Sequence, residues 1–135
     1  MTLNLIPANT KMEANGDGTS FDVSQSATRT FLCELVVSDQ IEQESLDVSI
    51  FGSADGETWA KNPLLKLPQQ FYRGKTKLIL DLSVRPEVKF LRARWELNRW
   101  GRGAPLPMFV AGLKLTEIPP MARVAAPRAS ALAGS

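Results

Sequence analysis

The sequence of 135 residues contains no histidine and only one cysteine, Cys33. The lack of histidine excludes Ser-His-Asp catalysis, Cys-His catalysis and histidine-ligated metal sites. One cysteine cannot form a disulfide within the chain, so a disulfide framework is excluded as well. No stretch approaches the ~20 uninterrupted apolar residues of a membrane span, and the first residues lack the basic and long apolar regions of a secretory signal. We therefore expect no membrane contact, and a location in the cytoplasm or in a particle.

Residue patterns typical of catalysis or cofactor binding are also missing. No pair of carboxylates is spaced for acid–base chemistry, and Gly101-Arg102-Gly103 lacks the Lys-Ser/Thr pair and the following helix of a phosphate-binding loop. We expect no enzymatic activity and no cofactor. Asp55 and Glu57 could bind calcium together with loop carbonyls, because Ca²⁺ takes oxygen ligands. Turn formation is the simpler interpretation of these two residues.

Charge is unevenly distributed along the chain, although the formal net charge is only +2. Residues 13–57 contain ten acids and one base, whereas residues 58–102 contain eleven bases and three acids. In a folded sheet protein, cross-strand pairs can neutralise much of this asymmetry. If opposite-signed faces persist, they favour head-to-tail self-assembly. A nucleic-acid partner is not expected, because the total charge is far from a strongly basic balance.

Several segments alternate apolar and polar residues with a period of two, which predicts antiparallel strands. We expect strands at 3–6, 20–24, 28–38, 45–51, 77–82, 90–99 and 108–118, with a weaker candidate at 10–14. Pro7 should end the first strand, and Asn15-Gly16-Asp17-Gly18 should form a turn. The inward side chains should be Phe31, Cys33, Leu35, Val37, Leu46, Val48, Ile50, Leu78, Leu80, Leu82, Leu91, Ala93, Trp95, Leu97, Phe109, Ala111, Leu113 and Leu115.

No segment shows a helical period over three turns, and prolines at 63, 68, 86, 105 and 107 would interrupt any helix drawn through those segments. About eight strands with turns between them predict an all-β fold, an antiparallel β-sandwich of jelly-roll type, over residues 1–118. An open barrel is the alternative. Residues 119–135 differ in composition, being rich in alanine and proline with two arginines and no acid. They form an extended C-terminal tail that is either disordered or docked on a partner.

Residues 46–59 form the most specific local pattern, a strand followed by a Ser-x-Asp-Gly turn and Trp59. Asp55-Gly56 supplies the tight turn, Ser53 can bond the loop backbone, and Trp59 packs at the start of the next segment. This hairpin resembles the Ser-x-Asp-Gly-x-x-Trp hairpin of discoidin-like (galactose-binding-like) β-sandwiches. The same hairpin recurs in small proteins of phage and phage-derived particles.

The resemblance extends over roughly residues 28–118, because Val88–Trp95 and Phe109–Glu117 are similar to later strands of the same families. It implies a sandwich fold, in which Asp55 and Trp59 are structural. Secreted discoidin domains usually carry a terminal disulfide and a signal peptide, and neither is seen in this sequence. The analogy therefore concerns the fold more than the ligand.

Two segments combine aromatic residues with arginine, which are enriched in binding hot spots. They contribute the candidate partner- or sugar-binding residues Phe71, Tyr72, Arg99, Trp100 and Arg102. These aromatic residues would form one patch if they lay at the same end of the sandwich, which the sequence does not determine. The alternative for Trp100 is a plug over the edge of the core.

The leading functional hypothesis is a non-enzymatic structural or assembly protein. It would be a β-sandwich subunit of a larger, phage-like particle or of a homo-oligomer, with protein partners and self-association. The alternative is a carbohydrate-binding module in which the loop aromatics stack on a glycan.

Overall fold

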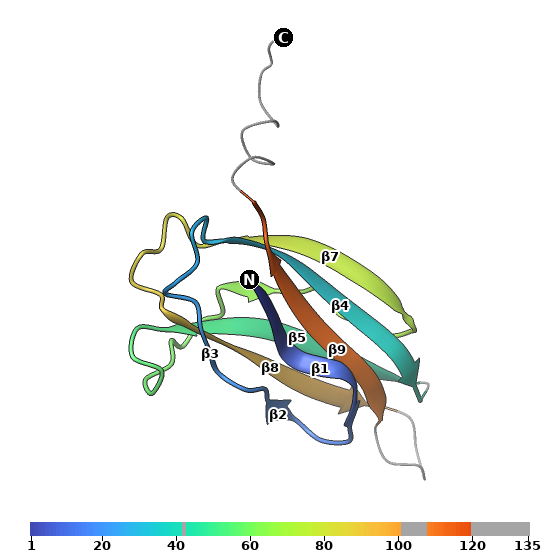
Figure 1. Ribbon diagram of the computed structural model, residues 1–135. Coiled ribbons are helices and arrows are strands. Elements are labelled where there is room, and N and C mark those ends of the chain that lie inside the picture. Colours follow the sequence, from blue (N-terminus) through green and yellow to red (C-terminus); the bar gives the residue numbers. More distant parts are fainter. Residues whose placement is uncertain (42, 101–107, 120–135) are drawn as a thin grey trace, which may run out of the picture.

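The computed structural model describes residues 1–41, 43–100 and 108–119, which form two antiparallel sheets packed face to face (Figure 1). These residues contain nine strands and no helix, and therefore no helix that could cross a membrane. The strands are β1 (Thr2–Met12), β2 (Gly16–Asp17), β3 (Phe21–Asp22), β4 (Thr30–Gln40), β5 (Glu44–Ser53), β6 (Leu65–Lys66), β7 (Gly74–Asp81), β8 (Phe90–Arg99) and β9 (Phe109–Glu117). The predicted tail, residues 119–135, lies outside the described residues except for Pro119.

The strand order confirms the jelly-roll sandwich. The first sheet has the order β1-β9-β4-β7, and the second has β2-β8-β5-β6 with β3 also paired to β8. The chain passes repeatedly from one sheet to the other, so most neighbours within a sheet are distant in sequence. The described residues contain nine strands instead of about eight. The predicted segments 3–6 and 10–14 form one strand, β1, and two short strands, β2 and β6, were not predicted.

The core lies between the sheets and is built by the predicted inward positions. In β4, β5 and β9 every one of these side chains has an exposed fraction of 2% or less: Phe31, Cys33, Leu35, Val37, Leu46, Val48, Ile50, Phe109, Ala111, Leu113 and Leu115. Fully burying one such large apolar side chain stabilises the fold by about 1.5–3 kcal/mol. Leu78, Trp95 and Leu97 pack against this core but are only partly buried.

Cys33 is a buried core residue, as its position in the strand predicted. Burial raises the pKa of its thiol to about 12. Since the thiolate is the reactive form of cysteine, this thiol is inert at neutral pH in the folded protein.

The first strand is longer than predicted, because Pro7 does not end it. β1 continues to Met12, and its register on β9 shifts between Ile6 and Thr10. The residues between these two positions form a bulge that has no pairing partner on β9, so the missing N–H of Pro7 is not needed by the ladder. Asn9 lies in this bulge with φ of 60°, a conformation that asparagine tolerates better than most residues.

The predicted turn at residues 15–18 was wrong, since Gly16 and Asp17 form β2 against Trp95 and Arg94 of β8. Gly16 is required there for close approach and not for turn geometry. A Cβ at this position would lie 2.7 Å from Cζ2 of Trp95. The aromatic ring therefore occupies the space that a side chain on β2 would need.

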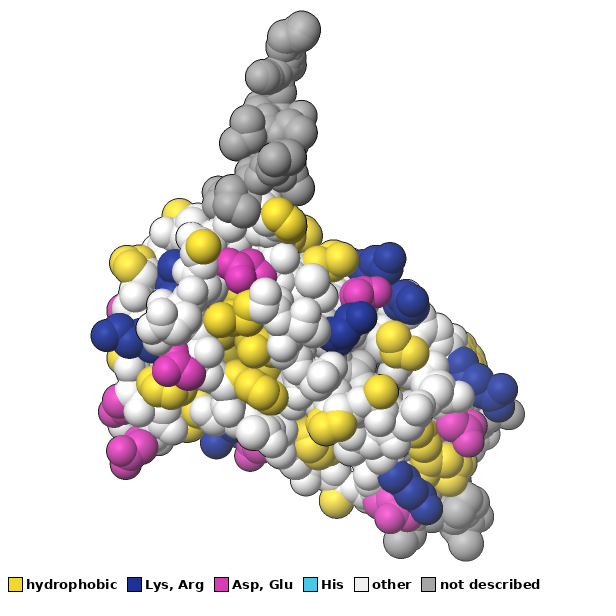
Figure 2. Space-filling view, viewed as in Figure 1, with side chains coloured by type: hydrophobic (Ala, Val, Ile, Leu, Met, Phe, Trp, Pro, Cys, Tyr) yellow, Lys and Arg dark blue, Asp and Glu magenta, His cyan; other side chains and the backbone are white. Residues whose placement is uncertain are grey.

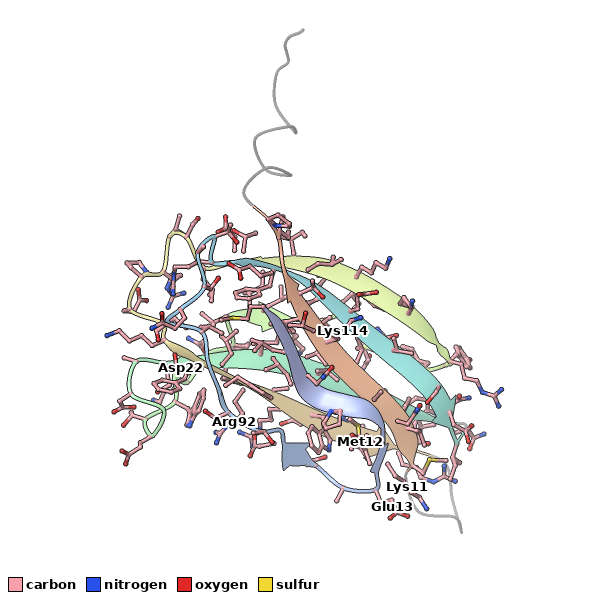
Figure 3. All side chains as sticks on the ribbon, viewed as in Figure 1. Lys11, Met12, Glu13, Asp22, Arg92 and Lys114 are labelled. Carbon is pink, nitrogen blue, oxygen red and sulfur yellow. The ribbon has the colours of Figure 1, made fainter. Side chains whose placement is uncertain are left out.

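Ion pairs between strands join the acidic and basic halves of the sequence. Glu34 of β4 lies 4.0 Å from the ammonium of Lys77 on β7. Asp17 of β2 lies 4.0 Å from the guanidinium of Arg92, which is labelled on β8 in Figure 3. The fold thus neutralises part of the charge asymmetry, as the cross-strand interpretation predicts.

Candidate binding surface at one end of the sandwich

Two segments that are distant in sequence meet where β5 begins and β8 ends. The amide of Leu46 donates to the carbonyl of Gln70, and the amide of Gln70 donates back to Leu46, both at 2.9 Å. On the other side of β5, the amide of Trp100 donates to the carbonyl of Gln43 at 3.0 Å. These bonds extend the sheet beyond β6 and β8, and they place the 71–72 segment beside residue 100.

The side chains of Phe71, Tyr72 and Trp100 form one cluster, which we call the aromatic patch. The ring centroids of Phe71 and Trp100 are 6.1 Å apart with planes at 62°, and those of Phe71 and Tyr72 are 6.4 Å apart at 46°. Both distances are within the usual range for aromatic pairs. The exposed fractions are 40%, 69% and 57% for Phe71, Tyr72 and Trp100. The large exposed fraction of Trp100 does not fit a plug over the core.

A buried carboxylate supports this end of the molecule. Glu44 has an exposed fraction of 1%. Its Oε2 accepts a hydrogen bond from the amide of Ile41 at 2.9 Å, and its Oε1 accepts one from the amide of Met108 at 3.0 Å. Glu44 thus ties the start of the β4–β5 connection to the residue preceding β9. Gln43, which accepts the Trp100 amide, has a φ of 62°, so the backbone under the patch is held in a sparsely populated conformation.

Sequence reasoning missed Glu44, although a signal was present. The residue has the same parity along β5 as the inward residues Leu46, Val48 and Ile50. A carboxylate at an inward position must find hydrogen-bond donors, because burying an unpaired charge is very unfavourable. Those donors are backbone amides of other segments, which no sequence pattern identifies.

Of the two predicted arginines, one lies within the residues that the structure describes. Arg99 lies opposite Glu44 in the β5·β8 ladder and is half-buried. Arg102 lies outside the described residues. Arg73, which follows the patch directly, has a guanidinium 3.6 Å from the carboxylate of Asp39, and both side chains are mostly exposed. The cluster thus has the mixture of aromatic and arginine side chains that is enriched in interface hot spots.

The 53–59 hairpin forms as predicted, and Asp55 has a structural role in it. Its Oδ1 accepts hydrogen bonds from the amides of Thr58 at 2.8 Å and Glu57 at 2.9 Å, and these bonds lower the pKa of the carboxyl. Ser53 Oγ accepts from the amide of Gly56, whose φ is 81°. Among the described residues there is no group of three His, Cys, Asp or Glu side chains that could hold a metal ion. The turn interpretation of Asp55 therefore fits the geometry, and the calcium interpretation of Asp55 and Glu57 has no such group to support it.

Trp59 lies beside the strand that precedes the hairpin. Ser53 and Trp59 form an isolated antiparallel bridge. The guanidinium of Arg92 lies 4.3 Å from the centroid of the Trp59 ring, a cation–π contact. The half-buried Trp59 thus closes the edge of the sandwich, which agrees with the structural role expected for it.

Comparisons with known proteins give no family. No family model and no curated protein matches the chain. One solved structure with some similarity is that of infectious bursal disease virus, Gx strain, at 12% identity and a TM-score of 0.49. The match covers 85% of this chain and 30% of the viral chain. Similarity at this level supports no conclusion on function, and the discoidin-like resemblance stays a prediction.

Proposed function

We propose that the chain is a non-enzymatic structural subunit that assembles with further copies of itself through the aromatic patch, as part of a larger, phage-like particle or a homo-oligomer. The observation that carries this proposal is the gathering of three exposed aromatic side chains at one end of the sandwich. Exposed apolar clusters of this kind mark interaction sites more often than scattered single residues do. Jelly-roll sandwiches serve as capsid subunits and as lectin domains, so the fold is compatible with assembly.

The size of the patch indicates what it contributes to an interface. Each aromatic side chain can bury about 150–250 Å². With the exposed fractions given above, the patch offers roughly 350 Å² per copy, less than half of the ~800 Å² that each partner buries in a stable interface. The patch would therefore be the desolvated centre of a larger contact, with polar neighbours such as Arg73 at its rim.

Light scattering coupled to size-exclusion chromatography tests this proposal. The wild type should be a defined oligomer, and the double variant Tyr72→Ala, Trp100→Ala should have a lower mass. The matched control is Val84→Ala, which changes a side chain that is 76% exposed and outside the patch. An oligomer of unchanged mass in the double variant, or a wild type that is monomeric at all concentrations, would refute the role of the patch.

Carbohydrate binding is the second candidate, because the rings of Tyr72 and Trp100 are exposed enough to stack on a sugar. The tilts of 46° and 62° within the patch argue for the protein contact, since these rings do not form one flat surface. A glycan array decides between the two. Specific binding that is lost in Trp100→Ala would favour the carbohydrate module, and an array without hits would remove it.

A further inference from the structure

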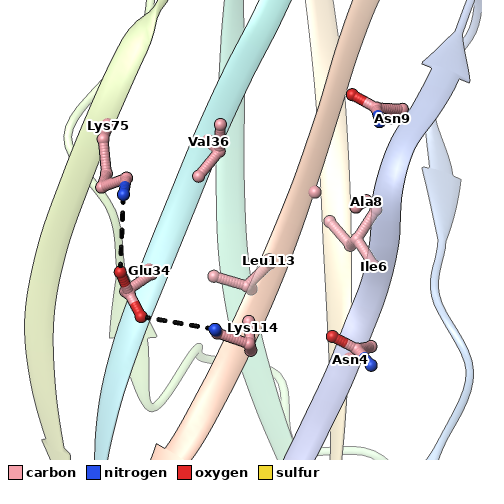
Figure 4. A pocket seen from close by; sticks show the side chains of 10 residues that line it. Asn4, Ile6, Ala8, Asn9, Glu34, Val36, Lys75, Leu113 and Lys114 are labelled. Carbon is pink, nitrogen blue, oxygen red and sulfur yellow. Dashed lines mark ion pairs between the residues drawn. The ribbon is translucent and has the colours of Figure 1, made fainter.

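A groove lies on the outer face of the first sheet, beside the bulge of β1. It has a volume of about 340 Å³ and is shown in Figure 4. Its lining residues are Asn4, Ile6, Ala8, Asn9, Glu34, Val36, Lys75, Gly112, Leu113 and Lys114. The close approach of β1 to β9 needs glycine at 112, because a Cβ there would lie 2.7 Å from Cα of Ala8. The groove is therefore a product of the bulge and is not a gap between loosely packed side chains.

The groove carries an excess of positive charge. Glu34 is approached by three ammonium groups, those of Lys75 at 3.9 Å, Lys77 at 4.0 Å and Lys114 at 3.9 Å. Two of these lysines, Lys75 and Lys114, line the groove together with Glu34, so the charged lining residues leave a net charge of +1. At these distances the lysines balance Glu34 without tight hydrogen bonds, and each ammonium has three N–H donors. Lys75 and Lys114, whose ion pairs with Glu34 are dashed in Figure 4, line the groove and can offer donors to an additional anion.

The same chain presents a carboxylate on a projecting rigid turn. The 53–59 hairpin extends from the end of β5, at the lower left of Figure 1, and acidic side chains are visible at this end in Figure 2. Asp55 is used inside the turn, whereas Glu57 lies at its tip and is exposed. Because the turn is already fixed by its own hydrogen bonds, little conformational entropy would be lost when its tip binds.

We propose that the lysine groove of one copy binds the Glu57 hairpin of a second copy. This inference rests on the proposed self-assembly, but it uses a different surface from the aromatic patch. Groove and hairpin are different parts of the molecule, so the contact is heterologous and propagates head to tail into rings or filaments. The aromatic patch and the lysine groove are thus two separate contacts, one mainly apolar and one mainly ionic.

The two contacts respond differently to salt. Between about 50 mM and about 500 mM salt the Debye length falls roughly threefold, which weakens contacts between exposed charges. The groove contact should therefore be lost at high salt while the aromatic contact persists. Failure of one contact can be recognised while the other is intact, because each has its own variants and its own salt response.

Lys75→Glu tests the groove, and Lys77→Glu is its matched control. Both lysines contact Glu34 at nearly the same distance, and both substitutions change the charge equally, but only Lys75 lines the groove. We expect Lys75→Glu to weaken the salt-sensitive association about tenfold or more, and Lys77→Glu to leave it close to wild type. Lys75→Gln, which adds no repulsion to Glu34, serves if Lys75→Glu does not fold.

A charge exchange between two variants gives the decisive result. Glu57→Lys alone should lose the salt-sensitive association, as Lys75→Glu alone does. An equal mixture of the two variants should recover the association. The basic hairpin of the Glu57→Lys variant then meets the acidic groove of the Lys75→Glu variant. The unaltered hairpin of the Lys75→Glu variant meets the unaltered groove of the Glu57→Lys variant. An unrestored mixture, or equal effects of the substitutions at 75 and 77, would overturn the proposal. So would binding of inorganic phosphate in the groove with no effect of Glu57→Lys on association, which would make the groove an anion site only.

Discussion

The carboxylate of Glu117 should make the stability of this fold depend on pH. Its Oε2 accepts hydrogen bonds from the amide of Thr28 at 3.0 Å, the hydroxyl of Ser26 at 2.7 Å and the hydroxyl of Thr28 at 3.3 Å. Its Oε1 lies 3.5 Å from the amino group of Met1. The hydrogen bonds, the Thr28 amide first, lower the pKa of Glu117 to about 2. One side chain at the end of β9 thus fixes both the segment before β4 and the start of β1.

The direction of the pH dependence follows from this lowered pKa. The folded protein binds the Glu117 proton less tightly than the unfolded chain, whose glutamates keep the ordinary value of 4.5. The stabilisation is therefore complete above about pH 4.5 and is lost as the pH falls toward about 2. Hydrogen bonds to a charged group contribute about 1.5–3 kcal/mol, and solvent near this site screens part of that. We therefore expect the Glu117 carboxylate to contribute about 2 kcal/mol to the free energy of unfolding.

Urea denaturation of the wild type and Glu117→Gln at a series of pH values measures this contribution. The variant should be less stable by about 2 kcal/mol at neutral pH, and the difference should shrink progressively below about pH 4.5. Glu13→Gln is the control, since its exposed pair with Lys11 should contribute less than about 1 kcal/mol. A difference that does not change with pH, or a variant as stable as wild type at neutral pH, would refute the reasoning.

Three further substitutions or probes test other parts of the structure. The side chain of Glu44→Gln can accept a hydrogen bond from only one of the two backbone amides that Glu44 now binds. This variant should therefore reduce the free energy of unfolding by about 1–3 kcal/mol and alter the fluorescence of nearby Trp100. The control Asp47→Asn should change neither. Gly112→Ala forces a Cβ against Ala8 and should destabilise the fold by about 1–3 kcal/mol in urea denaturation. An unchanged midpoint of urea denaturation would show that β1 can move away from β9 at little cost. Cys33 should not react with a thiol reagent in the native state and should react fully in urea; fast labelling of the native protein would contradict its burial.

The inward faces of the long strands could be predicted because a strand repeats every two residues. Once Phe31 and Cys33 are assigned to the core, the parity of β4 fixes the rest of that strand. The same holds for β5 and β9. The turn at 53–59 could also be predicted, since the hydrogen bonds that Ser53 and Asp55 make within it join residues that are close in sequence.

The features that could not be predicted depend on contacts distant in sequence. Gly16 looked like a turn residue because nothing local shows that Trp95 will lie against it. Pro7 looked like a strand terminator because the bulge that accommodates it depends on the register with β9. The aromatic patch was predicted only on the condition that its two segments lie at the same end of the sandwich, since the meeting of Phe71 and Trp100 requires both to be aligned on β5.

The position of β9 in the first sheet has a consequence for synthesis on the ribosome. β9 lies between β1 and β4, so the earliest strand has no neighbour in its own sheet until residues 109–117 have been made. Nascent chains that stop before this point would expose an unpaired β1 and one open edge of β4, both of which invite association with other chains. Pairing of strands this far apart in sequence also makes folding slow. β9, the last of the nine described strands, is therefore the one that completes the sheet, and we expect protection from proteolysis to appear in a single late step.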